Sequence, residues 1–408
     1  MRRFFLVVHA LTAVGHLPVA LAFATALDLL LSAVGVAVGS AVRLWLPWLV
    51  GTLAAAALVV ALRGRIRLLR WDQPIPRWRR LLVEEPYFTH WAASVACLPL
   101  FVLGAPLELL RASLAGGSAH VGLVALGAYL TGLCVAGWAV IVRRRWIRVR
   151  EIEVDIAGLS PALDGFRIAQ MSDLHIGSMC PAERAHRWVD RVNALEVDLV
   201  ALTGDYVTSG VRFHGDIADV LSRLRAREGV VAVLGNHDYF GEGDPLIGLL
   251  RAGGVTVLRN ERIRVARGEA GLVIAGVDDL WTRRADVART MAGWDRSEPL
   301  VMLAHDPALF PDIARRGAAL TLSGHTHWGQ VAVPFLARHL NLSRLTTPLH
   351  SGRHRLGDST LWINPGLGTT GPPLRLGAAP EITVLRLRAR RSSRAPETSH
   401  PARPAEAG

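Results

Sequence analysis

Five clusters of polar residues each follow an apolar run that is typical of a short strand. Their side chains are carboxylates, imidazoles and one carboxamide, with no cysteine among them. The clusters are Asp173–His175, Gly204–Asp205, Gly235–Asp238, His305 and His325–His327. Ligands bind at the carboxyl ends of strands in open α/β sheets, so we expect the clusters to line one site. Mixed oxygen and nitrogen donors suit a pair of divalent metals and exclude a cysteine-based structural zinc site.

The spacing within two of the clusters supports a shared cavity. In an extended segment, residues i and i+2 point to the same side. Asp173 and His175 are therefore expected to face one cavity, as are His325 and His327. Three glycines in these clusters are expected to let the chain turn tightly beside the ions. They are Gly204, Gly235 and Gly324.

The segments between the clusters predict a layered domain from residue 151 to 389. Apolar runs predict strands over 166–171, 197–202, 230–234, 272–277, 300–304, 319–322, 361–363 and 382–387. Helices are expected over 181–194, 214–226 and 245–252. This alternation favours an α/β or α+β fold. The remaining stretch, 390–408, is rich in Arg, Pro, Ser, Ala and Glu, and we predict that it is a disordered tail.

Residues 1–150 are predicted to form an all-α membrane region. Hydrophobic residues make up 51% of the chain, and a span needs about 20 apolar residues. Four stretches without Asp, Glu or Arg are long enough, and they predict spans near 4–27, 44–62, 86–107 and 119–142. A cleaved signal peptide is the alternative for 4–27, although it lacks a clear cleavage site and more spans follow.

The distribution of charge indicates an orientation and disfavours nucleic acid as a partner. The net charge of +12 divides into +11 for 1–150 (16 Arg, 5 acidic), −3 for 151–385 (24 Arg, 27 acidic) and +4 for 386–408 (6 Arg, 2 Glu). A nucleic-acid binder should carry its excess charge on the folded domain. Arginines gather at 2–3, 63–80 and 143–150. Because positive loops stay in the cytoplasm, we expect an inner-membrane protein whose termini and catalytic domain are cytoplasmic.

The five clusters, in this order, resemble the calcineurin-like metallophosphoesterases across roughly 165–330. The longer strings Ser172–Gly177, Gly324–Gln330 and Gly366–Gly371 look like the membrane-associated bacterial branch of that family, which extends the resemblance to about 387. The resemblance implies a β-sandwich of two mixed sheets flanked by helices. Here that fold would be preceded by the bundle of about four transmembrane helices.

The resemblance also implies a role for each residue of the site. Asp173, His175, Asp205 and His327 would hold the first metal. The second would be held by Asp205, Asn236, His305 and His325, with Asp205 bridging the two ions. The family's metals are commonly manganese, iron or zinc. His237 would stabilise the transition state or protonate the leaving oxygen, with Asp238 orienting it.

Several other polar residues are expected to be structural or solvated. Asp198 is expected to cap or turn before its strand, and His186 and His214 to be solvated on surface helices. His350 and His354 are expected in a solvated loop, with substrate contact as the alternative. Cys180 is not expected to be catalytic, while Arg375 lies in a region that resembles the family's substrate side.

The expected function is that of a membrane-anchored metallophosphoesterase that cleaves a phosphodiester or pyrophosphate bond, with a lipid-linked small molecule as the favoured substrate. Thr208 stands where many relatives have Asp, Asp238 where protein phosphatases have Glu, and Trp328 where Gly is common. These departures weigh against a protein phosphatase. The alternatives are a non-catalytic membrane sensor or scaffold, which the intact ligand set disfavours, and a nuclease, which the charge of 151–385 disfavours.

Overall fold

The computed structural model describes residues 2–35, 40–71, 73–332, 342–345 and 347–390. The predicted tail therefore lies almost wholly outside the described residues. Long apolar helices fill the N-terminal region: α1 (Arg2–Ala33), α2 (Ser40–Trp71), α4 (Glu85–Ala115) and α5 (Val121–Gly137). Short turns join or extend them: α3 (Arg77–Arg79), the π-helical η1 (Arg80–Glu84) and η2 (Trp138–Val142), and the 3₁₀ turn η3 (Arg143–Arg145).

The helical region contains four segments that are long and apolar enough to cross a membrane. They are Val8–Ala33, Leu44–Leu68, Arg77–Ala115 and Val121–Arg145. Each agrees in place with one of the four predicted spans, although the helices run past the charged residues that delimited them. The first helix, for example, continues beyond Asp28, the charged residue that ended the predicted span, as far as Ala33. Long helices that are apolar on most sides are expected in lipid, and the chain is a membrane protein.

A chain of polar side chains links three of these helices inside the bundle. His16 Nε2 lies 2.9 Å from His90 Nε2, and His90 Nδ1 lies 2.8 Å from the Tyr129 hydroxyl. His16 Nδ1 lies 2.7 Å from the carbonyl oxygen of Thr12, which can only accept a hydrogen bond. In neutral rings the hydrogen bonds therefore run in one direction, from Tyr129 through His90 to His16. Such contacts hold helices together where water is excluded.

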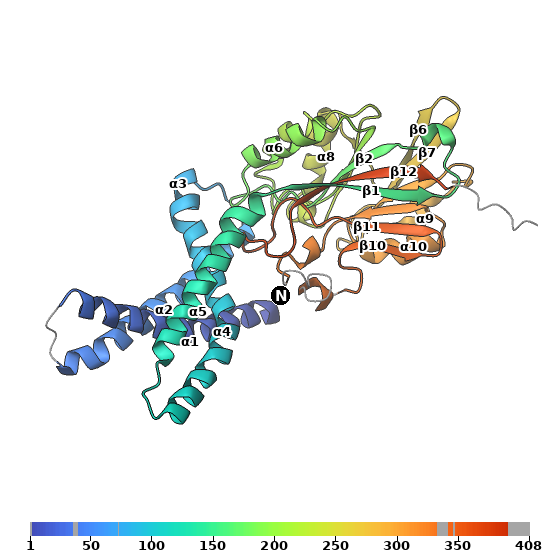
Figure 1. Ribbon diagram of the computed structural model, residues 1–408. Helices are drawn as coiled ribbons and strands as arrows, with labels where there is room; N and C mark the ends of the chain where they lie inside the picture. The colour runs from blue at the N-terminus through green and yellow to red at the C-terminus, as the bar shows by residue number, and fades with distance from the viewer. Residues whose placement is uncertain (1, 36–39, 72, 333–341, 346, 391–408) are drawn as a thin grey trace, which may run out of the picture.

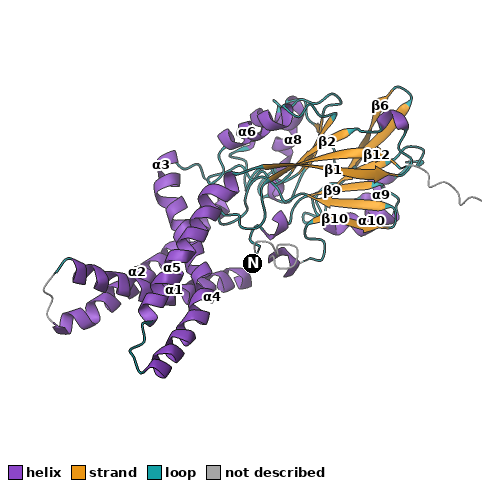
Figure 2. Cartoon of the chain, viewed as in Figure 1, coloured by secondary structure: helices purple, strands orange, loops and turns teal. Residues whose placement is uncertain are grey.

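The rest of the described chain forms two six-stranded mixed sheets (Figures 1 and 2). The first has the order β1-β12-β2-β3-β4-β5 and the second β10-β11-β9-β8-β7-β6. The first sheet contains β1 (Arg148–Ile156), β2 (Arg167–Met171), β3 (Leu199–Thr203), β4 (Val230–Val233), β5 (Thr256–Val257) and β12 (Glu381–Ala389). The second contains β6 (Glu261–Arg267), β7 (Ala270–Gly276), β8 (Leu300–Leu303), β9 (Leu320–Ser323), β10 (Gly352–Leu356) and β11 (Ser359–Ile363).

Helices cover the outer faces of both sheets, and the expected sandwich is confirmed. Trp188 of α6 (Ala182–Asn193), Ile217 of α7 (His214–Leu221) and Leu246 of α8 (Gly243–Ala252) pack on the first sheet. The second sheet is covered by α9 (Val287–Met291) and α10 (Phe310–Arg315). Between the sheets, residues such as Ile168 and Ile274 form a shared core. Short 3₁₀ turns complete the fold at Pro161–Leu163, His237–Tyr239, Pro307–Leu309, His327–Gly329 and Leu342–Leu345.

The strand directions place the carboxyl ends of the central strands of the first sheet on the side of the membrane helices. Strand β1 begins at Arg148, directly after η3, and runs away from the spans (Figure 1). β12 is parallel to β1, whereas β2 is antiparallel to β12, and β3 and β4 are parallel to β2. The carboxyl ends of β2, β3 and β4 therefore lie at the end of the sheet where the chain leaves the spans.

Candidate metal centre

Six of the seven predicted ligands form two groups at the carboxyl ends of the strands, and a third group of His175, Asp205 and His237 overlaps both. Asp173, His175 and His327 offer ligand atoms that lie within 4.8 Å of one another, and Asp205, His305 and His325 do the same. In the first group, His327 Nε2 lies 3.0 Å from His175 Nε2 and 3.4 Å from Asp173 Oδ1. The structure thus brings together the residues that sequence reasoning assigned to each ion, while their role as ligands stays a prediction.

Asp205 lies between the two groups. Its Oδ2 atom is 3.6 Å from His175 Nε2 and 3.2 Å from His305 Nε2. His305 Nε2 is in turn 3.3 Å from His325 Nδ1. One carboxylate oxygen is therefore close to donors of both groups, as a bridging ligand would be.

The donor atoms fit divalent cations. Asn236 is buried, and its Oδ1 atom has no hydrogen-bond partner among the residues that the structure describes. A buried carbonyl oxygen without a partner is costly unless something else binds it. His305 Nδ1 donates to the carbonyl oxygen of Thr203 at 2.7 Å, so in the neutral ring Nε2 presents a lone pair to the site. We conclude that this set of donors suits two metal ions.

The electrostatics of the two buried carboxylates point the same way. Burial raises the pKa of Asp173 to about 6, against the opposing charge of His305, and the charge of Asp205 contributes to the rise. Burial also opposes ionisation of Asp205, but His305 and His237 hold the pKa of that carboxyl well below its usual range. Burial lowers the pKa of His305, and Asp205 outweighs this effect and raises it to about 10. Bound cations would stabilise both carboxylates and take the place of the imidazolium charge.

The backbone of the site corrects one expectation about its geometry. Asp173 and His175 are not in an extended segment, because their φ angles are 51° and 47°. His325 and His327 have φ angles of 68° and 49°. Asp205 has a φ of 56°. Non-glycine residues in this left-handed region are uncommon and gather at functional sites, where the surrounding structure enforces the strain. The paired side chains therefore converge through left-handed backbone at these residues rather than through strand alternation.

All three predicted glycines are required by close approach of the backbone to the site, since a Cβ atom on Gly324 would lie 2.2 Å from Asp173 Oδ2. A Cβ atom on Gly204 would lie 2.5 Å from the nitrogen of Gly235 and 2.8 Å from His305 Nδ1, and its φ is +90°. A Cβ atom on Gly235 would lie 2.2 Å from Asp205 Oδ1. Any larger residue at one of these positions would displace a candidate ligand.

Asp238 does not orient His237, contrary to expectation. Its carboxylate instead accepts hydrogen bonds from the backbone amides of Asp205 and Gly235 at 2.9 Å and of Tyr206 at 2.7 Å. Asp238 therefore ties the loop after β3 to the loop after β4. Among the described residues, no hydrogen bond joins this carboxylate to the ring of His237. His237 Nδ1 donates to the carbonyl oxygen of Thr208 at 2.6 Å, which leaves Nε2 as the atom available to a substrate.

The structure places the remaining polar residues away from ligand roles. Asp198 accepts a hydrogen bond from the amide of Arg167 at 2.8 Å and pairs with Arg267, in keeping with a structural role. The expectation that His214 is solvated is wrong, because the side chain is buried under the first sheet's helices. His186 is half-buried rather than free in solvent.

Three further predictions concern the segments that flank the site. His354 lies on β10 and not in a loop, and its Nε2 donates to the carbonyl oxygen of Ser351 at 3.0 Å. The carbonyl oxygen of His350 accepts a hydrogen bond from the Thr326 hydroxyl at 2.8 Å. Cys180 is buried and contacts Gly177 through its backbone. Among the described residues, the side chains of His354 and Cys180 form no hydrogen bond with a candidate ligand.

Arg375 joins the metal centre to the membrane helices. Its side chain is fully buried, donates to the carbonyl oxygen of Gly368 at 2.6 Å, and lies 3.2 Å from His327 Nδ1. Its backbone amide donates to the carbonyl oxygen of Ala139 in η2 at 3.2 Å. The sequence indicated only that Arg375 lay on the substrate side; its contact with a span depends on packing.

Other contacts strengthen this junction between the two regions. Arg144 at the end of the fourth span is buried, pairs with Glu85, and donates to the carbonyl oxygen of Met179 at 3.2 Å. Arg184 of α6 donates to the carbonyl oxygen of Arg144 at 2.8 Å. The segment after His175 is therefore held against the end of a span, as Arg375 is.

Sequence reasoning missed two aromatic residues beside the centre. The ring of Phe240 lies 4.6 Å from that of His237, and the ring of Trp281 lies 5.5 Å from that of His325. Trp281 follows Asp278 and Asp279, a polar pair that is separated from the end of β7 by one residue. The position of this pair after an apolar strand could have predicted that the segment lies at the site, because the five polar clusters also follow apolar strands.

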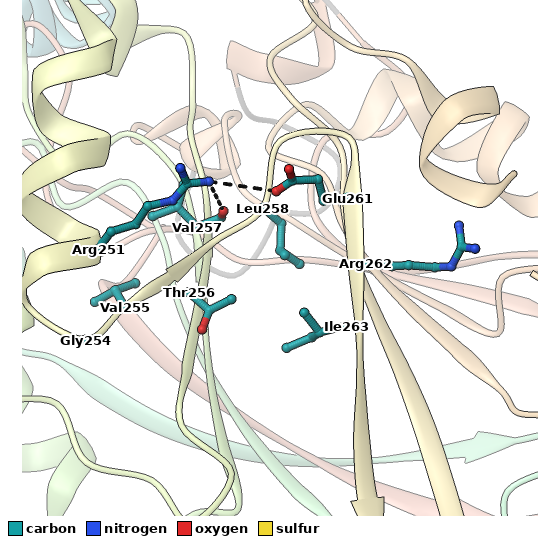
Figure 3. A pocket seen from close by; sticks show the side chains of 9 residues that line it. All are labelled: Arg251, Gly254, Val255, Thr256, Val257, Leu258, Glu261, Arg262 and Ile263. Atoms are coloured by element: carbon teal, nitrogen blue, oxygen red, sulfur yellow. Dashed lines mark hydrogen bonds and ion pairs between the residues drawn. The ribbon is translucent and has the colours of Figure 1, made fainter.

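A separate pocket of about 590 Å³ lies between α8, β5 and β6 (Figure 3). Two of its charged lining residues pair with each other, since Arg251 Nη2 lies 3.8 Å from Glu261 Oε2, and Arg251 also donates to the carbonyl oxygen of Val257. None of the predicted ligands lines this pocket. The convergent donors, and not this concavity, identify the functional site.

Comparison with known proteins agrees with this geometry. Residues 166–329 match the family model of calcineurin-like phosphoesterases. An uncharacterized metallophosphoesterase of Bacillus subtilis, YkuE, is 31% identical over 277 residues, which cover 65% of this chain and 94% of that protein. The chain belongs to the calcineurin-like phosphoesterase family. It is a metallophosphoesterase, and the match spans all five polar clusters.

Two further matches differ in how much they cover. A transmembrane protein with a metallophosphoesterase domain from Danio rerio is 31% identical over 59% of this chain, and the match spans 57% of that relative's length. Among solved structures, an archaeal phosphodiesterase is 16% identical over 49% of this chain and 84% of that chain, with a TM-score of 0.29. The segment that matches the family model, 166–329, follows the membrane helices in the chain.

Proposed function

We propose that this metallophosphoesterase cleaves a phosphodiester or pyrophosphate bond in a lipid-linked substrate at the membrane surface. The observation that carries the proposal is the hydrogen bond between Arg375 and Ala139. It attaches a residue that contacts His327 to the end of the fourth span. A substrate anchored in the same membrane would reach the metal centre without leaving its bilayer.

The proposed site holds two divalent ions, of which manganese, iron and zinc suit the mixed oxygen and nitrogen donors. Asp173, His175, Asp205 and His327 would hold one ion, and Asp205, Asn236, His305 and His325 the other. When bound, such a pair activates water as a nucleophile and stabilises the charge that develops on the phosphoryl oxygens.

The chain's own residues supply positioning and proton transfer. His237 keeps its Nδ1 hydrogen on the carbonyl oxygen of Thr208. Its Nε2 atom can then hold or give a proton at the leaving oxygen. Asp238 fixes the loops that carry Asp205 and Asn236, because its carboxylate accepts hydrogen bonds from the backbone amides of Asp205 and Gly235. The rings of His237 and His175 lie 4.7 Å apart, so the proton donor stands beside the first group of ligands.

We further propose that the catalytic domain and both termini face the cytoplasm. The support is the arginine distribution around the spans. Arg144 and Arg145 lie at the end of the fourth span, where the catalytic domain begins, and Arg65 and Arg79 pair with Glu84 near the start of the third. Positive residues of this kind stay on the cytoplasmic side.

The experiment compares a long-chain lipid diphosphate diester with its water-soluble methyl analogue. The protein is reconstituted in nanodiscs with manganese, and the Asp205→Asn variant is the control for metal-dependent turnover. We expect a higher kcat/KM for the lipid, through a lower KM. Equal kcat/KM values for the two substrates would contradict the lipid-linked part of the proposal.

A further inference from the structure

Trp281 is an exposed aromatic residue beside the metal centre that the ligand set does not use. It lies in the turn after β7, and 64% of its surface is exposed. Its ring contacts that of His325 at a tilt of 57°. Large aromatic side chains that are exposed beside a site commonly contact the ligand.

The turn that carries Trp281 is held in place by several hydrogen bonds. The indole Nε1 donates to Asp306 Oδ2 at 3.0 Å, next to the candidate ligand His305. The amide of Thr282 donates to Asp279 Oδ2 at 2.7 Å, and the amide of Arg284 to the carbonyl oxygen of Asp279 at 3.0 Å. The ring is therefore anchored to the strand end that contributes to the site.

The same turn is tied to the loop on which His237 lies. The Tyr239 hydroxyl donates to Asp278 Oδ1 at 2.6 Å, and Arg259 Nε donates to Asp278 Oδ2 at 3.0 Å. Trp281 and the proton-transfer residue His237 thus belong to loops that are joined directly. A group held by Trp281 would be positioned relative to the reacting phosphoryl group.

The anchor also decides what the indole can recognise. Its single polar hydrogen is used by Asp306, so the exposed part of the ring is a flat apolar surface. Such a surface recognises a partner by stacking and not by hydrogen bonding. We propose that Trp281 is a specificity-determining residue that stacks on a flat aromatic ring carried by the substrate next to its phosphoryl group. The inference deepens the proposed phosphohydrolase function and rests on it.

The test measures equilibrium binding of three phosphonates to the manganese-loaded full-length protein. Phenylphosphonate carries a flat ring, cyclohexylphosphonate a ring that is apolar but not flat, and methylphosphonate neither. Wild type should prefer phenylphosphonate to both. Trp281→Ala should weaken phenylphosphonate binding about tenfold and leave methylphosphonate binding unchanged, whereas Trp281→Phe should keep most of the preference. Trp78→Ala, at another exposed tryptophan, is the matched control and should bind as wild type does.

Three results would overturn the inference. They are equal binding of phenylphosphonate and cyclohexylphosphonate, an equal loss of all three ligands in Trp281→Ala, and no loss in that variant. The equal loss would mean that Trp281 only positions His325 and Asp306. Because binding is measured without turnover, a wild-type protein that shows the preference but hydrolyses no phosphoester would count against the proposed function and not against the stacking role.

Discussion

The backbone amide of Arg375 donates a hydrogen bond to the carbonyl oxygen of Ala139 at 3.2 Å, so the wall of the metal centre is attached to the last turn of a membrane span. The guanidinium group of the same residue lies 3.2 Å from His327 Nδ1. One buried side chain therefore contacts a candidate ligand while its backbone contacts the membrane region. The bundle supports the site as well as anchoring it.

Replacing Arg375 by Lys should weaken metal binding. Lysine cannot reproduce the two guanidinium hydrogen bonds to the carbonyl oxygen of Gly368 while also reaching His327. Loss of such a supporting contact typically costs about 10- to 100-fold in metal affinity or activity. Calorimetric titration of the metal-free variant with manganese measures the effect. Arg315→Lys, on the exposed face of α10, is the control, and equal affinities in the two variants would refute the supporting role.

The Glu85→Gln variant should destabilise the junction between the bundle and the catalytic domain. It leaves the buried guanidinium of Arg144 without its charged partner, which costs about 3 kcal/mol. Thermal unfolding in detergent checks the change. Glu108→Gln removes the exposed pair with Arg111 and should have little effect. A Glu85→Gln protein that unfolds at the wild-type temperature would show that the ion pair is not needed at the junction.

The Asp238→Asn variant should lose stability and metal together. The asparagine side chain would carry an NH₂ group in place of one carboxylate oxygen, so a backbone N–H that now donates to Asp238 would face another donor. Leaving that buried N–H without an acceptor costs about 1–3 kcal/mol of folding stability. The loops that carry Asp205 and Asn236 would then separate. Bound metal after dialysis and the unfolding temperature are the two readouts, with the exposed Asp219→Asn as control. Loss of turnover with metal content and stability unchanged would instead favour a direct role in catalysis.

His214 should make folding stability sensitive to mild acid. Burial lowers the pKa of His214 below its ordinary value of 6.5. Between the two values the unfolded chain binds the proton and the folded chain does not, so stability is full above 6.5 and falls as the pH drops below it. In His214→Leu this part of the loss should disappear. The drop in unfolding temperature between about pH 7.5 and about pH 5 should be smaller than in wild type, and an equal drop would contradict the assignment.

Much of the fold and of the site could be predicted because each signal was local. The runs that became β2, β3 and β8 are apolar and buried, and a polar cluster follows each of them at the edge where ligands bind. The four spans are also local, since length and the absence of charge define them. Asp173 and Asp205 were found in this way before any contact was known.

What sequence reasoning missed depends on contacts between distant segments. β1 alternates charged and apolar residues, and it becomes a strand by pairing in register with β12. The positive φ of Asp173 and His327, and the acceptance of three amides by Asp238, arise only once the loops meet. The burial of His214 likewise depends on how α7 packs against the rest of the domain.

The central claim is that Asp205 bridges two ions which support phosphoester hydrolysis. The most direct measurement is turnover of a chromogenic phosphodiester, beside the matching monoester, by detergent-purified protein with manganese, with EDTA, and as Asp205→Asn. We expect the wild type to cleave the diester, EDTA to abolish cleavage, and Asp205→Asn to lose more than about 100-fold, while Asp219→Asn keeps full activity. Turnover by Asp205→Asn equal to that of the wild type would contradict the account.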